Sequence, residues 1–310
     1  MVGSADLRTK EHSITPNPAL RRLGFADSER VAIIHTDDIG MCQASVTAFA
    51  ELAAFGLISS GAVMVPCAWF PAAAAGSRAK PEVDLGVHLT LTCEWDAYRW
   101  GPISTCDALS GLLDAEGYFY RSTELAQAHG RPEAVARELA AQIERALAAG
   151  MRPTHVDTHM GAVYSAAFLP AYLDVARRYR LAPMFFRDEE AGWRARGADA
   201  ETAVVMAQLS RQLEDAGVPL LDNIAMMPLD APDDRIGQAK RMFEGLPPGL
   251  THFIIHPSHD TPELHAIAAD WPSRVADYQT FMSDELRAYV RDAGIQVIGY
   301  RVLQELMPDS

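Results

Sequence analysis

Short apolar segments alternate with segments of helical period along most of the chain. The first apolar segment covers 31–35, and a helical pattern follows at 43–55 and stops before Gly56. Further strands are predicted at 61–65, 84–91, 155–159, 184–187, 219–223, 251–256 and 295–299. Further helices are predicted before Gly76 and at 132–149, 168–180, 199–216, 233–244 and 274–293. Such alternation is typical of a parallel sheet covered by helices.

Seven or eight strand–helix units within about 280 residues suit a closed or nearly closed barrel. We therefore predict an α/β fold, a closed or nearly closed (β/α) barrel. An open, doubly wound sheet is the alternative. The sequence contains neither G-x-G-x-x-G nor G-x-x-x-x-G-K-[ST], so it lacks both common nucleotide-binding signatures.

The barrel pattern covers only part of the chain. Residues 1–28 are polar and predict an N-terminal arm, whereas 29–310 predict a single domain. Within that domain, 93–131 shows no clear strand pattern and is predicted to be an inserted loop region. Long insertions of this kind are usually functional or mobile.

Composition narrows the class of partner. The 310 residues include 27 Lys and Arg against 41 Asp and Glu, a net charge of −14. Such a surface repels nucleic acids and anionic membranes but accepts a small neutral or sugar-like ligand. The four cysteines have no C-x-x-C spacing, and the first 30 residues lack the apolar stretch of a signal peptide. We expect a cytoplasmic protein without a membrane partner, and leave a homo-oligomer open.

Metal-binding and proton-transfer side chains follow several of the predicted strands. Asp37 and Asp38 come after the first strand, His88 lies toward the end of the third, and the H-x-D-x-H segment 155–159 and His256 belong to later ones. The carboxyl ends of parallel strands meet at one face of a barrel, so these residues are expected to converge there.

The set has the composition of a hydrolytic metal site. One carboxylate with two imidazoles can bind a divalent cation and leave a coordination position open. Successive side chains of an extended backbone point in opposite directions. One carboxylate of the pair Asp37 and Asp38 can therefore bind the cation while the other takes a proton. The alternative is that the pair is a turn or helix cap and that the histidines are core residues.

Four ordered motifs resemble a known family. They are HTDDIG at 35–40, GVHLTLT at 86–92, PTHVDTH at 153–159 and IHP at 255–257. Their order and spacing resemble those of the YdjC-like family, which includes chitooligosaccharide deacetylases and hopanoid-biosynthesis-associated deacetylases. The resemblance spans about 30–306. It implies a (β/α) barrel, deformed or seven-stranded, of the polysaccharide-deacetylase type. It also implies one divalent cation (Mg²⁺, Zn²⁺ or Mn²⁺) and removal of acetyl groups from an N-acetylated sugar or oligosaccharide.

The resemblance also implies roles for individual residues. It implies that Asp38, His88 and His159 are the metal ligands. It implies that Asp37 is the catalytic base and His256 the general acid. The carbohydrate deacetylase would thus be a hydrolase that activates water on the metal. Two other functions stay open: a metal-dependent amidase or esterase acting on a non-sugar metabolite, and a catalytically silent ligand-binding protein.

Two further residues match the family's motifs. Asp157 resembles a group that orients a ligating imidazole, and Arg187 resembles an arginine near the site. The sequence also departs from the family's common Asn-Ala-Asp-Asp-Phe-Gly, with His35, Thr36 and Ile39 in its first motif. These departures are expected to alter the choice of substrate, because they would lie beside the pocket.

Some candidates lie outside the motifs. Trp95 is the aromatic residue of the insertion nearest to the second motif and is predicted to offer a sugar ring an apolar platform. Cys67 is predicted to line the pocket, and His252 to be an ordinary surface or loop residue. Arg274 and Asp277 are predicted either to reach the site or to lie exposed in a helical turn.

Overall fold

The structure is a computed structural model that describes residues 16–309. The expected arm 1–28 therefore lies partly outside the described residues. Its described end holds the short helix α1 (Pro18–Arg22), which Asn17 caps by accepting a hydrogen bond from the Ala19 amide. The Asn17 side chain also donates to the Leu220 carbonyl at 3.0 Å. These contacts attach residues 17–22 to the barrel.

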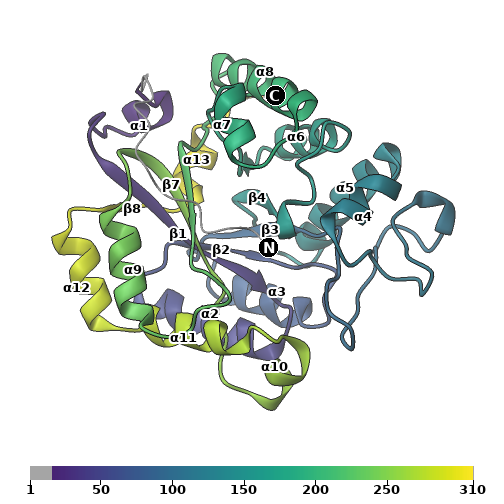
Figure 1. Ribbon diagram of the computed structural model, residues 1–310, viewed down its shortest axis with the longest axis horizontal. Coiled ribbons are helices and arrows are strands. Elements are labelled where there is room, and N and C mark those ends of the chain that lie inside the picture. The colour runs from purple at the N-terminus through teal and green to yellow at the C-terminus, as the bar shows by residue number, and fades with distance from the viewer. Residues whose placement is uncertain (1–15, 310) are drawn as a thin grey trace.

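Eight strands of the described chain form one sheet in which every pair is parallel (Figure 1). They are β1 (Arg30–Ile39), β2 (Ser60–Val63), β3 (Leu85–Leu89), β4 (His155–Thr158), β5 (Ala182–Pro183), β6 (Asn223–Met226), β7 (Gly249–Ile255) and β8 (Gln296–Val297). Seven follow the order β5-β4-β3-β2-β1-β7-β6, and β8 pairs with the start of β1. One isolated bridge, Phe186 to Leu221, links the two ends of this row. The predicted α/β barrel, deformed or seven-stranded, is confirmed: seven strands form its main row and β8 lies off that row.

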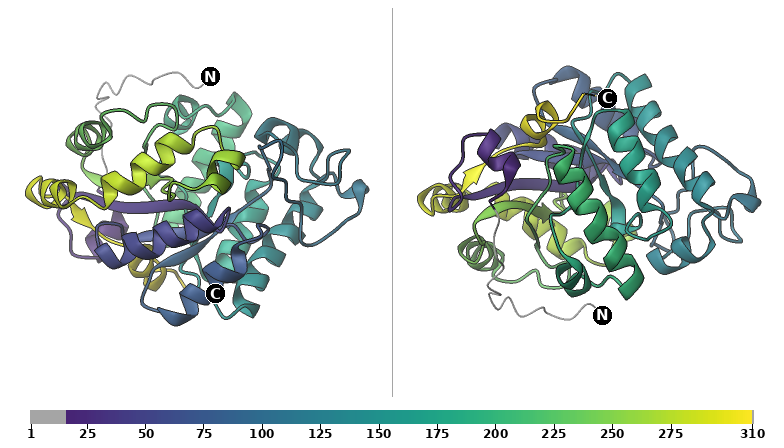
Figure 2. Two further views of the ribbon diagram at one scale, coloured as in Figure 1. Left: turned by 90° about the horizontal axis from the view of Figure 1, so that it is seen from below. Right: turned by 90° about the horizontal axis from the view of Figure 1, so that it is seen from above.

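Helices surround the sheet in both views of Figure 2. They are α2 (Gln43–Phe55), α3 (Phe70–Ala79), α4 (Thr123–His129), α5 (Pro132–Ala148), α6 (Leu169–Arg178), α7 (Glu190–Ala195), α8 (Ala200–Asp215), α9 (Arg235–Glu244), α10 (Pro262–Ile267), α11 (Trp271–Phe281), α12 (Asp284–Asp292) and α13 (Tyr300–Glu305), with 3₁₀ turns η1 (Ala108–Ser110) and η2 (His159–Gly161). Among the described residues, none of these helices is long and apolar enough to cross a membrane.

Several sequence-based boundaries were wrong. The predicted strand 219–223 lies instead at β6 (Asn223–Met226), and β1 extends to Ile39 beyond the predicted 31–35. The predicted strand 184–187 is absent, because β5 lies at Ala182–Pro183 and Phe186 forms only the closing bridge. Helix α3 continues past Gly76, since one exposed glycine costs a helix only about 1 kcal/mol. The predicted helix 274–293 is two helices, α11 and α12. Ser283 separates them by accepting hydrogen bonds from the first amides of α12.

The segment 93–131 lies to one side of the barrel (Figure 2) and contains only η1 and α4 among its described elements. It is fastened to α5 by Glu138, a buried carboxylate that accepts hydrogen bonds from the amides of Ile103 and Ser104 at 3.1 and 2.8 Å. At its start, an isolated bridge joins Thr92 to Tyr120. These contacts hold the segment against α5 and next to the carboxyl end of β3.

Candidate active site

The first two acidic residues occupy a distorted end of β1. The pairing of β1 with β2 shifts register between Thr36 and Ile39. Asp38 lies inside this register shift and has a left-handed backbone conformation, with φ at 60°. Such a conformation costs free energy in a residue other than glycine and is found mainly at functional sites. The two carboxylates therefore diverge because of a backbone distortion, and the expected alternation of an extended strand is not the cause.

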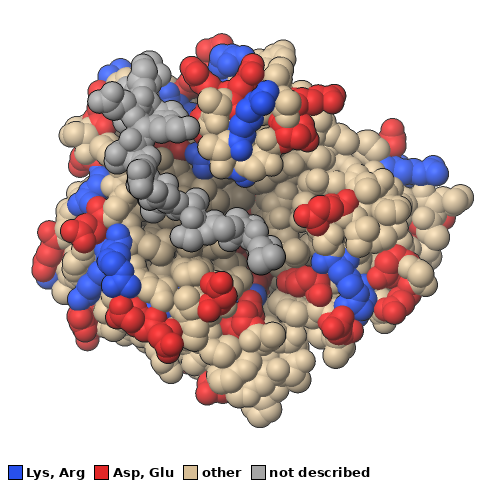
Figure 3. Space-filling model, in the orientation of Figure 1, with Lys and Arg blue, Asp and Glu red and all other residues tan. Residues whose placement is uncertain are grey.

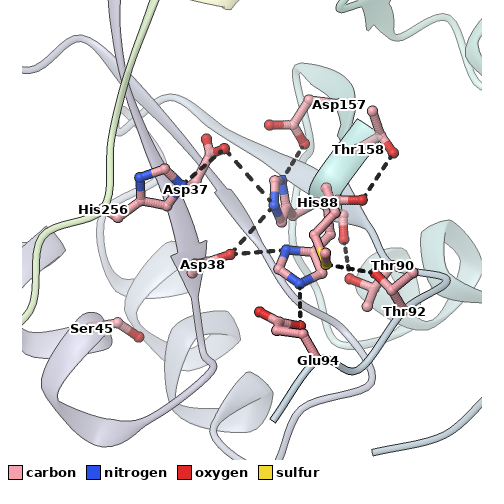
Figure 4. Close-up of polar contacts among 12 residues, drawn as sticks. Asp37, Asp38, Ser45, His88, Thr90, Thr92, Glu94, Asp157, Thr158 and His256 are labelled. Carbon is pink, nitrogen blue, oxygen red and sulfur yellow. Dashed lines mark hydrogen bonds and ion pairs between the residues drawn. The ribbon is translucent and has the colours of Figure 1, made fainter. Parts of the chain in front are cut away.

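Three side chains form a cluster of the size that a metal ion requires. Asp38 Oδ1 lies 3.5 Å from His88 Nε2 and 3.1 Å from His159 Nδ1, and the donor atoms all lie within 4.8 Å of one another. Neighbouring donors around a cation at about 2.0–2.2 Å are separated by about 3.0–3.5 Å. Asp38 Oδ1 and His88 Nε2 are buried without a hydrogen-bond partner. Figure 4 shows both side chains directed at one centre. These residues fit a divalent cation.

Each histidine of the cluster is held through its other ring nitrogen. His88 Nδ1 lies 3.0 Å from Asp157 Oδ1 (Figure 4). His159 Nε2 lies 3.0 Å from Glu94 Oε2. An N–H directed at a carboxylate fixes the tautomer, so the remaining nitrogen of each ring faces the cluster unprotonated when a cation binds. Sequence reasoning identified Asp157 but missed Glu94. Its signal was an acidic residue at the start of the insertion, beside Trp95.

The pKa values of both histidines in the cluster are raised. Burial lowers the pKa of His159, but Glu94 and Asp38 outweigh it and raise that pKa to about 9. Burial likewise opposes the raised pKa of His88, which Asp157 and Asp37 impose. Both histidines therefore tend to carry an extra proton, and a cation that binds to the cluster would displace these protons.

Arg274, in α11, reaches the site, which decides between the two expectations for it. Its Nη1 donates to Asp38 Oδ2 at 2.7 Å and its Nε donates to Asp270 Oδ1 at 2.8 Å. Burial raises the pKa of Asp38, but this arginine and His159 outweigh burial and hold it well below its usual range. The guanidinium also lies 5.6 Å from the ring centre of Trp95. Arg274 thus fixes one oxygen of Asp38 and leaves the other facing the histidines.

Asp37 lies beside the cluster with different partners. Its Oδ1 is 2.7 Å from His35 Nδ1, and its Oδ2 is 3.9 Å from both His88 Nε2 and His256 Nε2. Burial raises the pKa of Asp37, yet the charges of His88 and His35 lower it overall, so the group is ionised. Oδ1 of Asp37 is therefore held in place by His35, and Oδ2 faces His88 and His256.

His256 follows β7 and is positioned from its backbone. Its amide donates to Asp277 Oδ2 at 3.0 Å, and Asp277 is paired with the buried Arg235. Asp277 therefore lies in the interior, and the expectation of an exposed helical turn is wrong for it. Burial lowers the pKa of His256, which leaves the ring neutral at rest and strongly acidic once it is protonated.

The remaining sequence candidates lie at different places. Trp95 is half-buried and packs edge-to-face with Trp100, with the two ring centres 5.3 Å apart. Cys67 is buried, and burial together with the nearby Asp38 raises its pKa. Arg187 forms an ion pair at 2.9 Å with Asp222 and another with Glu214. A hollow lies at the centre of the face shown in Figure 3, with acidic side chains on several sides.

His252 is not a surface residue, so the expectation for it was wrong. It is fully buried in β7, where every position is buried. Its ring centre lies 4.6 Å from that of His35, and its Nδ1 lies 3.0 Å from the Tyr300 hydroxyl. Tyr300 stacks on His155 at 3.9 Å. A cluster of aromatic and imidazole rings therefore fills the barrel beneath Asp37, and no local pattern in the sequence marks it.

Known proteins resemble this chain over most of its length. The family model described as YdjC-like protein matches residues 31–292. A carbohydrate deacetylase of Thermus thermophilus is 35% identical over 288 residues, 93% of this chain and 98% of that protein. A chitooligosaccharide deacetylase of Klebsiella pneumoniae is 28% identical, over 88% of this chain and 99% of that protein. A crystal structure of a putative cellobiose-phosphate cleavage protein from Enterococcus faecalis superposes with a TM-score of 0.72 at 22% identity, covering 89% and 99% of the two chains.

Proposed function

The chain belongs to the YdjC-like protein family, and from this premise we propose that it is a cation-dependent carbohydrate deacetylase. It would remove the acetyl group from an N-acetylated sugar or oligosaccharide by hydrolysis. The observation that carries the proposal is that Asp38, His88 and His159 form a three-donor cluster. Asp37 and His256, which can transfer protons and are not part of this cluster, lie beside it. Relatives named carbohydrate deacetylase that align over nearly the whole chain support it.

Asp38, His88 and His159 would hold one divalent cation, Zn²⁺, Mn²⁺ or Mg²⁺. A cation there would acidify a water molecule and polarise the acyl carbonyl as a Lewis acid. Arg274 neutralises the second oxygen of Asp38 and keeps that carboxylate oriented. Asp157 and Glu94 keep the two imidazoles in the required tautomers.

Asp37 would accept the proton of the attacking water at Oδ2. Its Oδ1 is engaged by His35, so the carboxylate cannot rotate freely, and its lowered pKa keeps it ionised and ready to accept. His256, which is neutral at rest, would take that proton from Asp37 Oδ2, 3.9 Å from its Nε2, and deliver it to the departing amine. Its lowered pKa makes the protonated ring a strong acid, which a poor leaving group of this kind requires.

The test is acetate release from N-acetylglucosamine oligomers, measured with each cation in turn and compared with O-acetyl and aryl esters. Asp37→Asn and His256→Ala should each lower turnover about 10²- to 10⁴-fold and keep the cation. His88→Ala should lose the cation. His265→Ala removes a surface imidazole paired with Asp260 and serves as the control. Cation-loaded protein that hydrolyses only the esters, or none of the panel, would contradict the proposal.

We assign Trp95 and Cys67 to substrate binding, since both lie near Asp38 or its partner Arg274. Trp95 would support the apolar face of a sugar ring. Trp95→Ala should raise KM more than it lowers kcat, whereas the exposed Trp69→Ala should change neither. We further propose that 29–310 acts as one domain in the cytoplasm. The four cysteines are free, as expected in a reducing compartment, and cell fractionation tests the location.

A further inference from the structure

Beneath Asp37, a continuous chain of polar contacts runs through the barrel. His35 Nε2 lies 2.8 Å from His155 Nε2, and His155 Nδ1 lies 2.9 Å from the Thr154 hydroxyl. That hydroxyl in turn contacts Asp84 Oδ1. His35, His155 and Thr154 are fully buried, and Asp84 is 8% exposed. The contacts lead from the carboxyl end of β1 to Asp84 and Thr154, which precede β3 and β4 at the other end of the sheet.

We propose that a proton relay of four residues crosses the interior of the barrel from Asp37 to the opposite end of the sheet. Its members are His35, His155, Thr154 and Asp84. His35 acts as a positioning residue for Asp37, and the other three set the number of protons that His35 carries. The relay goes beyond the proposed hydrolysis and rests on it only for the role of Asp37.

Counting hydrogens along the chain defines its resting state. The Thr154 hydroxyl has one hydrogen, so when it donates to ionised Asp84 it must accept from His155 Nδ1. His155 is neutral, because burial and the charge of His35 hold its pKa well below the usual value. Its bare Nε2 must then accept from His35 Nε2. His35 Nδ1 faces the ionised Asp37 and must also donate, so His35 carries two protons and a positive charge.

One concerted shift produces the other state. His35 gives its Nε2 proton to His155 Nε2, His155 gives its Nδ1 proton to Thr154, and Thr154 gives its hydroxyl proton to Asp84. One proton leaves His35 and one arrives at Asp84, so both become neutral and the His35 N–H to Asp37 is kept.

The two ends of the relay have suitable surroundings. His35 Nε2 lies 3.7 Å from Asp157 Oδ2, and the ring centres of His252 and Tyr300 lie 4.6 and 5.9 Å from that of His35. These neighbours separate a charge on His35 from solvent. Asp84 borders a cavity of about 310 Å³ that Ser60 and Lys80 also line. Burial raises the pKa of Asp84. The outer end can therefore hold a proton and exchange it with water.

The geometry also explains a residue of the second motif. A Cβ on Gly86 would lie 2.5 Å from His155 Cε1 and from His155 Nε2. The ring of His155 therefore occupies the space that any other side chain at position 86 would need. Tyr300 covers the ring from another side in near-parallel stacking, at an interplanar angle of 15°. The central ring of the relay is thus fixed in the orientation that both hydrogen bonds require.

Nitrogen chemical shifts of the imidazole rings test the relay without turnover. The full chain, labelled with ¹⁵N-histidine and saturated with Zn²⁺, would be examined by long-range ¹H–¹⁵N correlation, with assignments from His35→Asn and His155→Asn. In the wild type we expect both nitrogens of His35 protonated and His155 Nε2 unprotonated. Thr154→Val should move a proton to His155 Nε2 and remove one from His35.

Matched variants keep the test specific. Thr154→Ser retains the hydroxyl and should preserve the wild-type shifts. Thr251→Val removes a buried hydroxyl that has no hydrogen-bond partner, and should also preserve them. A wild-type His35 with one unprotonated nitrogen would overturn the relay. So would Thr154→Val shifts equal to wild type or reproduced by Thr251→Val. Absence of acetate release would refute the proposed function and leave these shifts unaffected.

Discussion

Replacing Gly86 by alanine is a sharp probe of the interior beneath the candidate active site. The added methyl would lie 2.5 to 2.7 Å from three atoms of the His155 ring, closer than real Cβ atoms approach a neighbour. The ring cannot easily retreat, because Tyr300 stacks on it at 3.9 Å and His35 contacts it at 2.8 Å. Inserting a methyl into a packed core costs about 1–3 kcal/mol.

Part of that cost is offset by the unfolded state. Alanine restricts the unfolded chain relative to glycine, which stabilises the folded protein by about 0.4–1 kcal/mol. We therefore expect Gly86→Ala to lower the free energy of unfolding by about 1–2 kcal/mol. Urea unfolding followed by circular dichroism would show this as a lower midpoint with an unchanged slope.

Gly76 supplies the matched control. It lies exposed in α3, and a Cβ built there meets nothing within 4 Å. Gly76→Ala should raise the free energy of unfolding by about 0.5–1 kcal/mol, since glycine weakens a helix interior. If Gly86→Ala were as stable as the wild type while Gly76→Ala behaved as expected, the packing of His155 described above would be wrong.

Three further predictions concern the cation cluster. Arg274→Leu leaves buried Asp38 without its arginine partner and should lower the free energy of unfolding by about 3–5 kcal/mol in chelated protein, but by less with saturating Zn²⁺. Urea unfolding measures both losses, and equal losses under the two conditions would refute the pairing. Glu94→Gln should weaken Zn²⁺ binding about 10- to 100-fold by calorimetry, and unchanged affinity would exclude an orienting role. In chelated protein, His159 has a pKa of about 9 against 6.5 unfolded, so its stabilisation is complete below pH 6.5 and lost as pH rises through 9. Urea midpoints should fall over that range, and the fall should be smaller in His159→Gln, where only His88 of the cluster keeps a raised pKa.

Local patterns were sufficient for much of the fold. The apolar period of α5 and the closing Gly56 of α2 predicted both helices to within a residue, because helix boundaries depend on neighbours along the chain. The weak points were the elements whose limits depend on distant partners. β5 is two residues long, and its position is set by pairing with β4 rather than by its own composition.

The candidate site divides in the same way. The carboxyl ends of parallel strands meet at one face, so the order of the motifs sufficed to bring Asp38, His88 and His159 together. Glu94 was missed because it reaches His159 from an insertion with no regular pattern.

The sequence by itself determined the elements, the parallel sheet and the side chains that gather at its carboxyl end. These follow from periodicity and from the direction of the strands, which are properties of the chain read in order. Only the tertiary structure decided that Arg274 pairs with Asp38 and that His252 lies in the core. Both depend on contacts across many residues of sequence, where packing rather than polarity selects which side chains are buried. The same holds for the path from Asp37 to Asp84, which exists because β1, β4 and the residues just before β3 and β4 bring their polar side chains together inside the barrel.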